Sequence, residues 1–259
     1  MLLEARGISK FYQGTPAVKD VSFRIAPGEV LGYLGPNGAG KSTTVGILTG
    51  LIKPTSGLVY YDGYDVSTRL VEYRRHIGYV PEEPYLYPFL SGREYLQLVA
   101  QLREMPAAAA VRTTDGLLEL LGLGAARDLS IGAYSKGMRQ KVLIAGALMH
   151  NPEVLIFDEP LSGLDVTAAL VFRRLVAELG RAGKMVLYSS HVLEVVEKLC
   201  TRVVVLYRGR VVADDTVDHL RDLMALDSLE QVFMELVIRE DPDRTAREVV
   251  DLITAGQSA

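Results

Sequence analysis

The sequence has a single cysteine and no long apolar run, and each shortage excludes a class of protein. Cys200 cannot form a disulfide within the chain, which suits a reducing compartment. The longest apolar candidate, residues 142–149, is far shorter than the roughly 20 residues that cross a bilayer as a helix. The amino terminus, MLLEARGISKFYQG, has charges where a signal peptide needs its apolar core. We therefore expect a soluble protein.

An excess of positive charge is also missing. The chain has 28 Lys and Arg against 32 Asp and Glu, which gives a formal net charge of −4. Because no overall basic field is present, we expect no recruitment of nucleic acid by electrostatic attraction. Hydrophobic residues make up 49% and charged residues 23%, an ordinary balance for a globular protein of 259 residues. That length suits one large domain or two modest ones.

Short apolar runs of β type recur along the chain and predict an α/β fold. Several are uniformly apolar, as strands covered on both faces are, and helical patterns lie between them, which indicates a largely parallel sheet. Residues 207–210 separate two valine-rich runs and predict a hairpin. The predicted strands are Val30–Leu34, 58–61, Ile77–Val80, 154–157, 185–188 and 203–206.

The middle and the end of the chain have helical patterns only. From about Gly92 to Met149 the strand signal stops, which predicts an all-helical insertion. A linker-like break is expected near Asp214 and Asp215, followed by amphipathic segments. The predicted helices are 94–103, 115–121, 136–149, Val217–Met224, Leu229–Val237 and 245–253. We therefore predict a main domain over residues 1–215, with a helical subdomain at about 90–150, and a helical extension or tail over 216–259.

A glycine-rich loop predicts a phosphate site. Residues 35–42, GPNGAGKS, match the pattern G-x-x-x-x-G-K-[ST] and lie between a predicted strand and a predicted helix. Glycines let backbone N–H groups converge on phosphate oxygens, and the helix N-terminus adds partial positive charge. Lys41 is expected to reach the β- and γ-phosphates and Ser42 to bind Mg²⁺. The predicted nucleotide-binding residues of this segment are Gly35, Pro36, Asn37, Gly38, Ala39, Gly40, Lys41, Ser42 and Thr43.

Two acids at a strand end predict a metal ligand and a general base for hydrolysis. The run VLIFDEP ends an apolar strand with Asp158 and Glu159. Asp158 is expected in the Mg²⁺ shell, and Glu159 is expected to take a proton from an attacking water. A lone Asp-Glu pair is usually a solvated turn, but its pairing with a phosphate loop favours the functional interpretation. A glutamate directly after the metal-binding aspartate favours hydrolysis over transfer to a second substrate.

Further motifs, in their order around the phosphate loop, resemble the ATP-binding subunits of ABC transporters over roughly residues 3–215. Tyr12 matches the aromatic on which that family stacks adenine, and residues 134–138, YSKGM, occupy the place of its signature loop, usually written LSGGQ. Residues 162–165, SGLD, match its D-loop, and His191 matches its switch histidine. The resemblance implies a P-loop core with a mixed β-sheet, an antiparallel β subdomain and an inserted helical subdomain. It also implies Lys41, Glu159 and His191 as catalytic residues.

The signature loop predicts a second anion site. It opens a helix, so its backbone N–H groups and Ser135 suit a phosphate. Because the chain already has one phosphate loop, this second site needs another nucleotide. In the family, two subunits pack head to tail, so the resemblance assigns Ser135, Gly137 and Asp165 to nucleotide binding in a dimer, whether of identical chains or of close paralogues. Lys136 and Met138 depart from the usual signature.

The stretch YVPEEPYLYPFL, residues 79–90, departs from the family at Glu82, where many members have glutamine. The glutamate still offers oxygen, the ligand type that Mg²⁺ prefers, so Glu82 joins Ser42 and Asp158 as a predicted metal ligand. Beyond Glu82, the apolar residues fall where the family docks its membrane partner. We expect residues 85–90 to contact an integral membrane permease. The alternative is that these rings pack under the helical insertion.

The expected function is an ATP-binding and ATP-hydrolysing subunit, with ATP and Mg²⁺ as cofactors, that powers transport from the cytoplasmic face of the membrane. Three features resemble subunits that pair with bacterial export-type permeases: the segment YSKGMRQK, Glu82, and the segment SLEQVFMEL at residues 228–236. One alternative is a soluble ABC-type ATPase acting on nucleic acid or ribosomes; such proteins commonly carry two ATPase units or zinc-binding cysteines, which this chain lacks. A third option, a regulator without turnover, is disfavoured by Glu159 and His191.

Overall fold

A mixed six-stranded sheet forms the centre of the molecule, in a computed structural model that describes residues 1–224, 228–237, 247 and 250. Its strand order is β10-β9-β3-β8-β7-β6, and every neighbouring pair is parallel except β9 with β10. The parallel strands are short and almost wholly apolar, as expected for strands covered on both faces. The strands are β3 (Val30–Leu34), β6 (Ile77–Val80), β7 (Val154–Asp158), β8 (Met185–Ser190), β9 (Arg202–Tyr207) and β10 (Arg210–Thr216).

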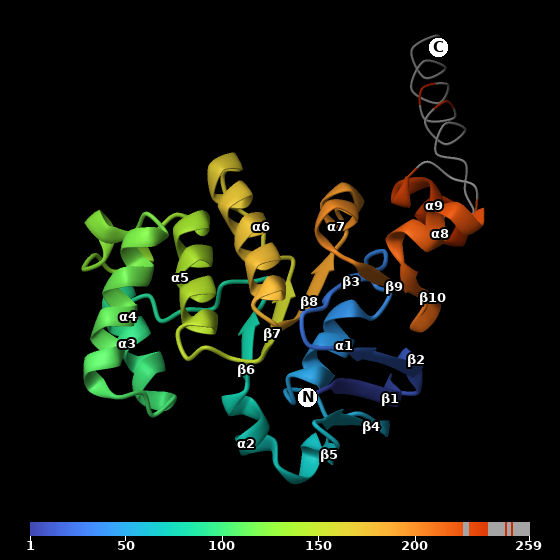
Figure 1. Ribbon diagram of the computed structural model, residues 1–259, viewed down its shortest axis with the longest axis horizontal. Helices are drawn as coiled ribbons and strands as arrows, with labels where there is room; N and C mark the ends of the chain where they lie inside the picture. The colour runs from blue at the N-terminus through green and yellow to red at the C-terminus, as the bar shows by residue number, and fades with distance from the viewer. Residues whose placement is uncertain (225–227, 238–246, 248–249, 251–259) are drawn as a thin grey trace, which may run out of the picture.

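An antiparallel sheet of four strands, in the order β2-β1-β4-β5, covers one side of the central sheet (Figure 1). Its strands are β1 (Leu3–Tyr12), β2 (Thr15–Ile25), β4 (Ser56–Tyr61) and β5 (Tyr64–Asp65). Helix α1 (Lys41–Leu48) packs between the two sheets, and Val45, Ile47 and Leu48 join a core that both sheets share. The predicted antiparallel subdomain is confirmed, although the strand at 58–61, within β4, is the part of it that the residue pattern predicted.

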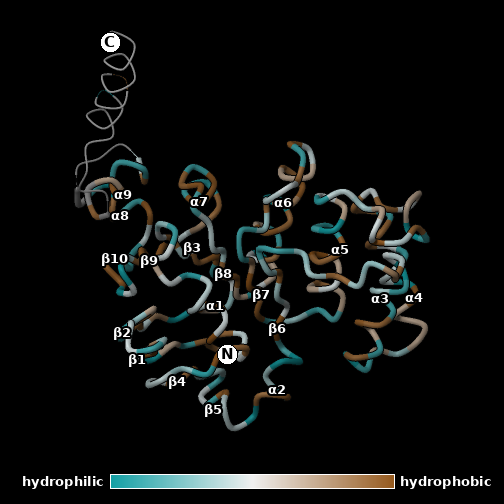
Figure 2. Tube along the Cα trace, turned by 180° about the vertical axis from the view of Figure 1, so that it is seen from behind, coloured by the Kyte–Doolittle hydropathy of each residue, from teal (hydrophilic) through white to brown (hydrophobic). Residues whose placement is uncertain are grey.

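Helices cover the opposite face of the central sheet. The second core joins that face to α5 (Lys136–Leu148), α6 (Val166–Arg181), α7 (Leu193–Leu199), α8 (Val217–Met224) and α9 (Leu229–Val237). In Figure 2, α8 and α9 alternate between hydrophilic and hydrophobic colour, and their buried side chains Val217, Leu220, Leu229 and Val232 belong to this core. In the described part of the chain, no helix is long and apolar enough to cross a membrane. The helix predicted at 245–253 lies outside the described residues, apart from 247 and 250.

The helical insertion has a core of its own. Helices α3 (Gly92–Leu102) and α4 (Ala107–Leu120) pack against α5 at one end of the molecule (Figure 1). Ser91 and Glu94 form a capping box that begins α3. Helix α4 starts eight residues before the predicted boundary, because the alanine-rich tract at its start is good helix-forming sequence. The remaining helical segments are α2 (Leu70–Arg75) and the 3₁₀ turns Val66–Thr68, Gly124–Ala126 and Ile131–Ala133.

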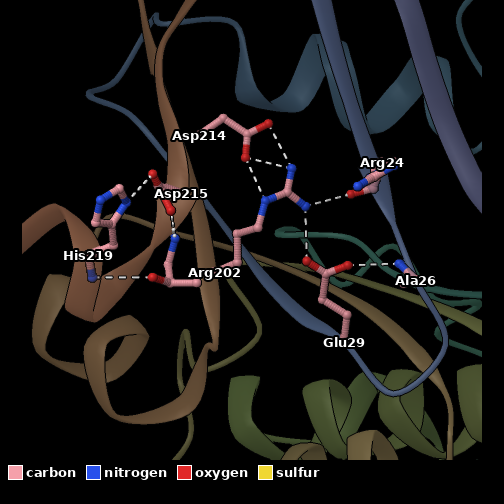
Figure 3. A network of polar contacts seen from close by, with 8 residues as sticks. Arg24, Ala26, Glu29, Arg202, Asp214, Asp215 and His219 are labelled. Atoms are coloured by element: carbon pink, nitrogen blue, oxygen red, sulfur yellow. Dashed lines mark hydrogen bonds and ion pairs between the residues drawn. The ribbon is translucent and has the colours of Figure 1, made fainter.

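The prediction of a linker at Asp214 and Asp215 is wrong. Both residues lie in β10, where they pair with Val204 and Val203 of β9. The Arg202 guanidinium binds Asp214 through two hydrogen bonds of 2.6 and 2.7 Å and also donates to Glu29 Oε1 at 2.9 Å (Figure 3). The two aspartates that resembled a polar linker are therefore part of a charged network that ties the edge hairpin to β3.

Candidate functional site

The carboxyl ends of β3, β6, β7 and β8 meet at one edge of the central sheet and open into a cavity of about 470 Å³. This is the edge at which open α/β sheets bind their ligands. The cavity gathers residues from loops that are far apart in the sequence. Its lining residues are Ala17, Asn37, Gly38, Gly40, Lys41, Ser42, Thr43, Glu82, Asp158, Glu159 and His191.

The phosphate loop connects β3 to α1 in a conformation that requires glycine at two positions. Gly40 has φ 105°, and a Cβ there would lie 2.4 Å from the Ala17 carbonyl oxygen. A Cβ on Gly35 would lie 2.5 Å from the Leu206 carbonyl oxygen. The loop therefore packs directly against two strands, and side chains at these positions would push it out of place.

Lys41 and the first turn of α1 face the cavity with positive potential. Lys41 is mostly buried, and its Nζ donates to the Gly35 carbonyl at 2.7 Å and, more weakly, to the Pro36 carbonyl at 3.4 Å. An ammonium has three N–H donors, so one remains for an anion. The first turn of α1 contains no acidic residue, and its backbone N–H groups point out of the helix N-terminus. Together these groups form a site suited to phosphate.

Asp158 provides the negative side of the cavity. Burial, with the neighbouring charges of Glu82 and Glu159, raises the pKa of the Asp158 carboxyl, and Lys41 opposes this shift. Asp158 Oδ1 is buried and has no hydrogen-bond partner in the described part of the chain. A cation in the cavity would supply the missing partner and lower that pKa, so the donor set fits a divalent metal.

The metal ligands are incomplete without phosphate. Among the described residues, no group of three or more His, Cys, Asp and Glu side chains forms a metal site. The cavity supplies the carboxylates of Asp158 and Glu82 and the hydroxyl of Ser42. Mg²⁺ is usually held by one or two carboxylates together with substrate phosphates and water, and these oxygens match that coordination shell.

Glu159 is held between two side chains from the end of β8. Its Oε1 lies 2.7 Å from His191 Nδ1, and its Oε2 accepts a hydrogen bond of 3.3 Å from Ser190 Oγ. The carboxylate is largely shielded whereas the His191 ring is mostly exposed. Glu159 also has φ 46°, a left-handed backbone conformation that is uncommon for a side chain of this size. An ionised carboxylate fixed by a histidine at the cavity rim has the chemistry that a general base requires.

Seven of the residues predicted to bind nucleotide do not line this cavity. Gly35, Pro36 and Ala39 belong to the phosphate loop itself, and the other four lie on other elements. Tyr12 is half-exposed at the end of β1. Ser135 caps α5, its Oγ accepting from the Met138 N–H at 3.2 Å, and Asp165 caps α6, its Oδ1 accepting from the Ala168 N–H at 2.8 Å. Gly137 lies in the first turn of α5 against the carbonyl of Gly163. Within one chain, the signature loop therefore does not reach the phosphate loop.

Two residues of the site had no signal in the sequence. Ala17 of β2 lines the cavity because the antiparallel sheet folds over the phosphate loop. Ser190 reaches Glu159 because β7 and β8 are neighbours, with Asp158 paired to Ser189. Neither residue type is distinctive, and only the pairing of strands brings them to the site.

The loop after β6 has one residue at the cavity and several aromatic residues at the surface, as its composition suggested. Glu82 lines the cavity two residues beyond the strand. Tyr85, Tyr87 and Phe89 have 85%, 62% and 92% of their surface exposed. Leu86 instead packs against the core of the helical insertion and against the core between the central sheet and its covering helices. The rings therefore do not pack under the helical insertion; Leu86 anchors the loop and leaves them at the surface.

Comparisons with known proteins agree on one family. Residues 18–162 match the family model described as ABC transporter. The chain is 36% identical over 224 residues to the ABC transporter ATP-binding protein NatA of Bacillus subtilis, covering 86% of this chain and 91% of NatA.

Two solved structures extend the likeness to the fold. An ATP-binding subunit of an ABC transporter superposes with a TM-score of 0.86 at 35% identity, over 91% of this chain and 99% of the other. A dimeric ATP-binding cassette in a post-hydrolysis state, bound to ADP and Pi, superposes with a TM-score of 0.77 at 28% identity, over 83% of this chain and 98% of the other.

Proposed function

The chain belongs to the ABC transporter family of ATP-binding proteins, and on that premise we propose that it hydrolyses ATP in a Mg²⁺-dependent reaction coupled to transport through a separate membrane permease. The observation that carries this proposal is the single cavity that unites Lys41, Asp158, Glu159 and His191. A phosphate-binding cation, a carboxylate suited to a metal and a proton acceptor are the three parts that hydrolysis of a nucleoside triphosphate requires.

The roles of the cavity residues follow from their chemistry. Lys41 and the N–H groups at the start of α1 bind the β- and γ-phosphates. Ser42, Asp158 and Glu82 would hold Mg²⁺, and the bound ion would supply positive charge against the phosphate oxygens. Tyr12 stacks on adenine, as the family resemblance implies. Glu82 brings a second negative charge to the cavity and would supply an oxygen ligand.

Glu159 acts as the general base. Its Oε1 and Oε2 are oriented by His191 and Ser190, so the carboxylate is held at the cavity rim, where it would take a proton from a water that attacks the γ-phosphate. His191 stabilises the position of the base, and its exposure leaves it free to contact a bound nucleotide as well.

A second subunit completes each site. Ser135, Gly137 and Asp165 lie away from the cavity of their own chain, and the N-terminus of α5 offers donors for phosphate. Head-to-tail packing of two chains would place each signature loop over the partner's nucleotide, which requires two composite sites related by a two-fold axis. The dimeric ADP- and Pi-bound relative supports this arrangement.

The membrane partner binds at residues 85–90. Tyr85, Tyr87 and Phe89 form an exposed aromatic cluster of the kind that protein contacts use. This contact would hold the chain peripherally at the cytoplasmic face of the membrane, and the likeness of residues 134–141 to export-type subunits favours outward transport.

We also propose the division into an ATPase domain over residues 1–215 and an extension over 216–259. The separate core of the segment between Leu96 and Met149 supports a helical subdomain at about 90–150. The described part of the extension docks on the ATPase domain through α7, where Arg221 pairs with Glu197 at 3.5 Å.

Removal of the base tests the proposal. We expect Glu159→Gln to lower kcat by about 10²–10⁴-fold, the usual contribution of general acid–base catalysis, while ATP binding persists. The matched control is Glu178→Gln at an exposed position of α6, which should leave turnover unchanged. Steady-state phosphate release measures kcat, and size-exclusion chromatography with ATP should show a longer-lived dimer for Glu159→Gln. Unchanged turnover in this variant would exclude Glu159 as the base.

The family model and the relatives reported above are transporter ATPases, so they do not favour the alternative of an ATPase acting on nucleic acid or ribosomes. Co-purification of the full chain from cells discriminates the two functions. A hydrophobic integral membrane protein should accompany it, and RNA or DNA in its place would overturn the transport assignment.

A further inference from the structure

Gln140 is a fully buried polar side chain outside the cavity. It lies in α5, and its Nε2 donates a hydrogen bond of 3.1 Å to the Pro160 carbonyl. Its Oε1 has no hydrogen-bond partner in the described part of the chain. A buried amide with an unsatisfied oxygen carries a desolvation cost. An apolar side chain of the same size would avoid that cost, so the contact with Pro160 calls for another explanation than stability.

The contact ends on the loop that carries Glu159. Pro160 follows Glu159 directly, and the Glu159 N–H donates to the Ser189 carbonyl at 3.0 Å. The next turn closes when the Ser162 N–H donates to the Glu159 carbonyl at 3.1 Å. The strained backbone of Glu159 is therefore held by the sheet through Ser189 on one side and by α5 through Gln140 on the other.

Helix α5 touches the same loop at a second point. A Cβ on Gly137 would lie 2.5 Å from the Gly163 carbonyl oxygen, and a Cβ on Gly163 would lie 2.7 Å from Lys136 Cγ. Gly137 and Gln140 are three residues apart, so they lie on one face of the helix. The beginning of α5 is thus docked on the loop from Glu159 to Gly163 along that face, and Ser135 at its N-terminus lies one residue before the contact.

We propose that Gln140 is a positioning residue that transmits engagement of the signature loop to Glu159 of the same chain. The inference rests on the proposed function, because it takes Glu159 as the base and the signature loop as the site of the partner's phosphates. A phosphate bound at Ser135 pulls on the N-terminus of a rigid helix, and the amide of Gln140 passes that displacement to Pro160. Each site of the dimer then orients its base according to whether the other nucleotide is in place.

The variant that tests this role is Gln140→Met. Methionine keeps the length and volume of the side chain and removes the unpaired Oε1, but it cannot donate to Pro160. We expect kcat to fall about 10–100-fold, since displacement of a catalytic group by about 1 Å has effects of that size. The KM for ATP should change less than about threefold, because the cavity at Lys41 is intact. Cooperativity between the two sites should also decrease.

Two matched variants separate positioning from folding. Gln101→Met makes the same substitution at an exposed position of α3 and should have no effect. Ile144→Val loosens the packing of α5 without touching Pro160, and it should lower the thermal stability while kcat persists. Thermal unfolding of all three variants with and without ATP shows whether each chain is folded and binds nucleotide.

A double variant locates the effect. If Gln140 acts through Glu159, then Gln140→Met should have no further effect on the residual hydrolysis of Glu159→Gln. Wild-type kcat and cooperativity in a folded Gln140→Met protein would overturn the inference. So would a further fall in kcat in the double variant as large as the fall that Gln140→Met causes alone. Normal turnover in Glu159→Gln alone would instead overturn the proposed function, so the two failures are distinguishable.

Discussion

Replacement of Arg202 by methionine should destabilise the protein and leave its chemistry intact. The guanidinium donates to Glu29 Oε1 and to the Arg24 carbonyl, both at 2.9 Å, and forms a two-point contact with Asp214 (Figure 3). These bonds join β9, β10 and the turn that leads into β3. Methionine keeps much of the stem packing but leaves two carboxylates and one carbonyl without their donor.

The magnitude follows from the burial of the three charges. The side chains of Arg202, Glu29 and Asp214 are only 21%, 15% and 27% exposed. Breaking a fully buried ion pair costs about 3–5 kcal/mol, and partial access to water reduces that penalty. We expect a loss of about 2–3 kcal/mol in the free energy of unfolding. For a chain of this size, that loss corresponds to a fall in Tm of roughly 5–10 °C.

The assay is urea unfolding followed by far-UV circular dichroism, with Lys198→Met as the control. Lys198 forms a pair of 2.7 Å with Glu194, but both side chains are mostly exposed, so its removal should change stability little. At 25 °C the folded Arg202→Met protein should hydrolyse ATP within about twofold of the wild type, since Arg202 does not line the cavity. Equal stability of the two variants would refute the buried-network argument, and so would a stability loss confined to Lys198→Met.

Three further predictions concern the partner, the metal and pH. Replacement of both Tyr85 and Tyr87 by alanine should abolish co-purification of the permease while ATP binding persists; an unfolded variant would contradict the exposure of these rings. Glu82→Gln removes one charged oxygen and should raise the Mg²⁺ concentration for half-maximal hydrolysis; an unchanged Mg²⁺ titration would exclude Glu82 as a ligand. Burial lowers the pKa of His150 from 6.5 to about 4, because it disfavours the charged ring. The stability that the neutral ring contributes is therefore complete above pH 6.5 and is lost as the pH falls towards 4. His150→Gln keeps a donor for the Ile77 carbonyl and should flatten that pH dependence in urea unfolding, and an unaltered slope would contradict it.

The parts of the fold that the sequence predicted are those with strong local patterns. Residues 154–157 are wholly apolar and end in two acids, so they could be assigned to a buried strand with a site at its end. Strands β1 and β2 have a weaker signal in the sequence. Buried and exposed positions do not alternate regularly in β1, and in β2 they alternate only over residues 20–25, because the pairing of the two strands contains register shifts. Asp214 and Asp215 resemble a linker in the sequence because paired acids are typical of loops. Arg202, which holds Asp214 in a strand, lies on the neighbouring strand.

The phosphate loop and the acids after β7 are predictable because each depends on residues close together in the chain, and the order of such short motifs along the chain indicates the family. Which of these motifs meet in space depends on the three-dimensional fold. It brings Glu82, Asp158 and His191 to one cavity through the parallel order of β6, β7 and β8, and it keeps Ser135 away from that cavity at the start of α5. It also joins Gln140 to Pro160 across 20 residues. Contacts between distant segments depend on strand order and helix packing, which a local pattern of residue types does not encode.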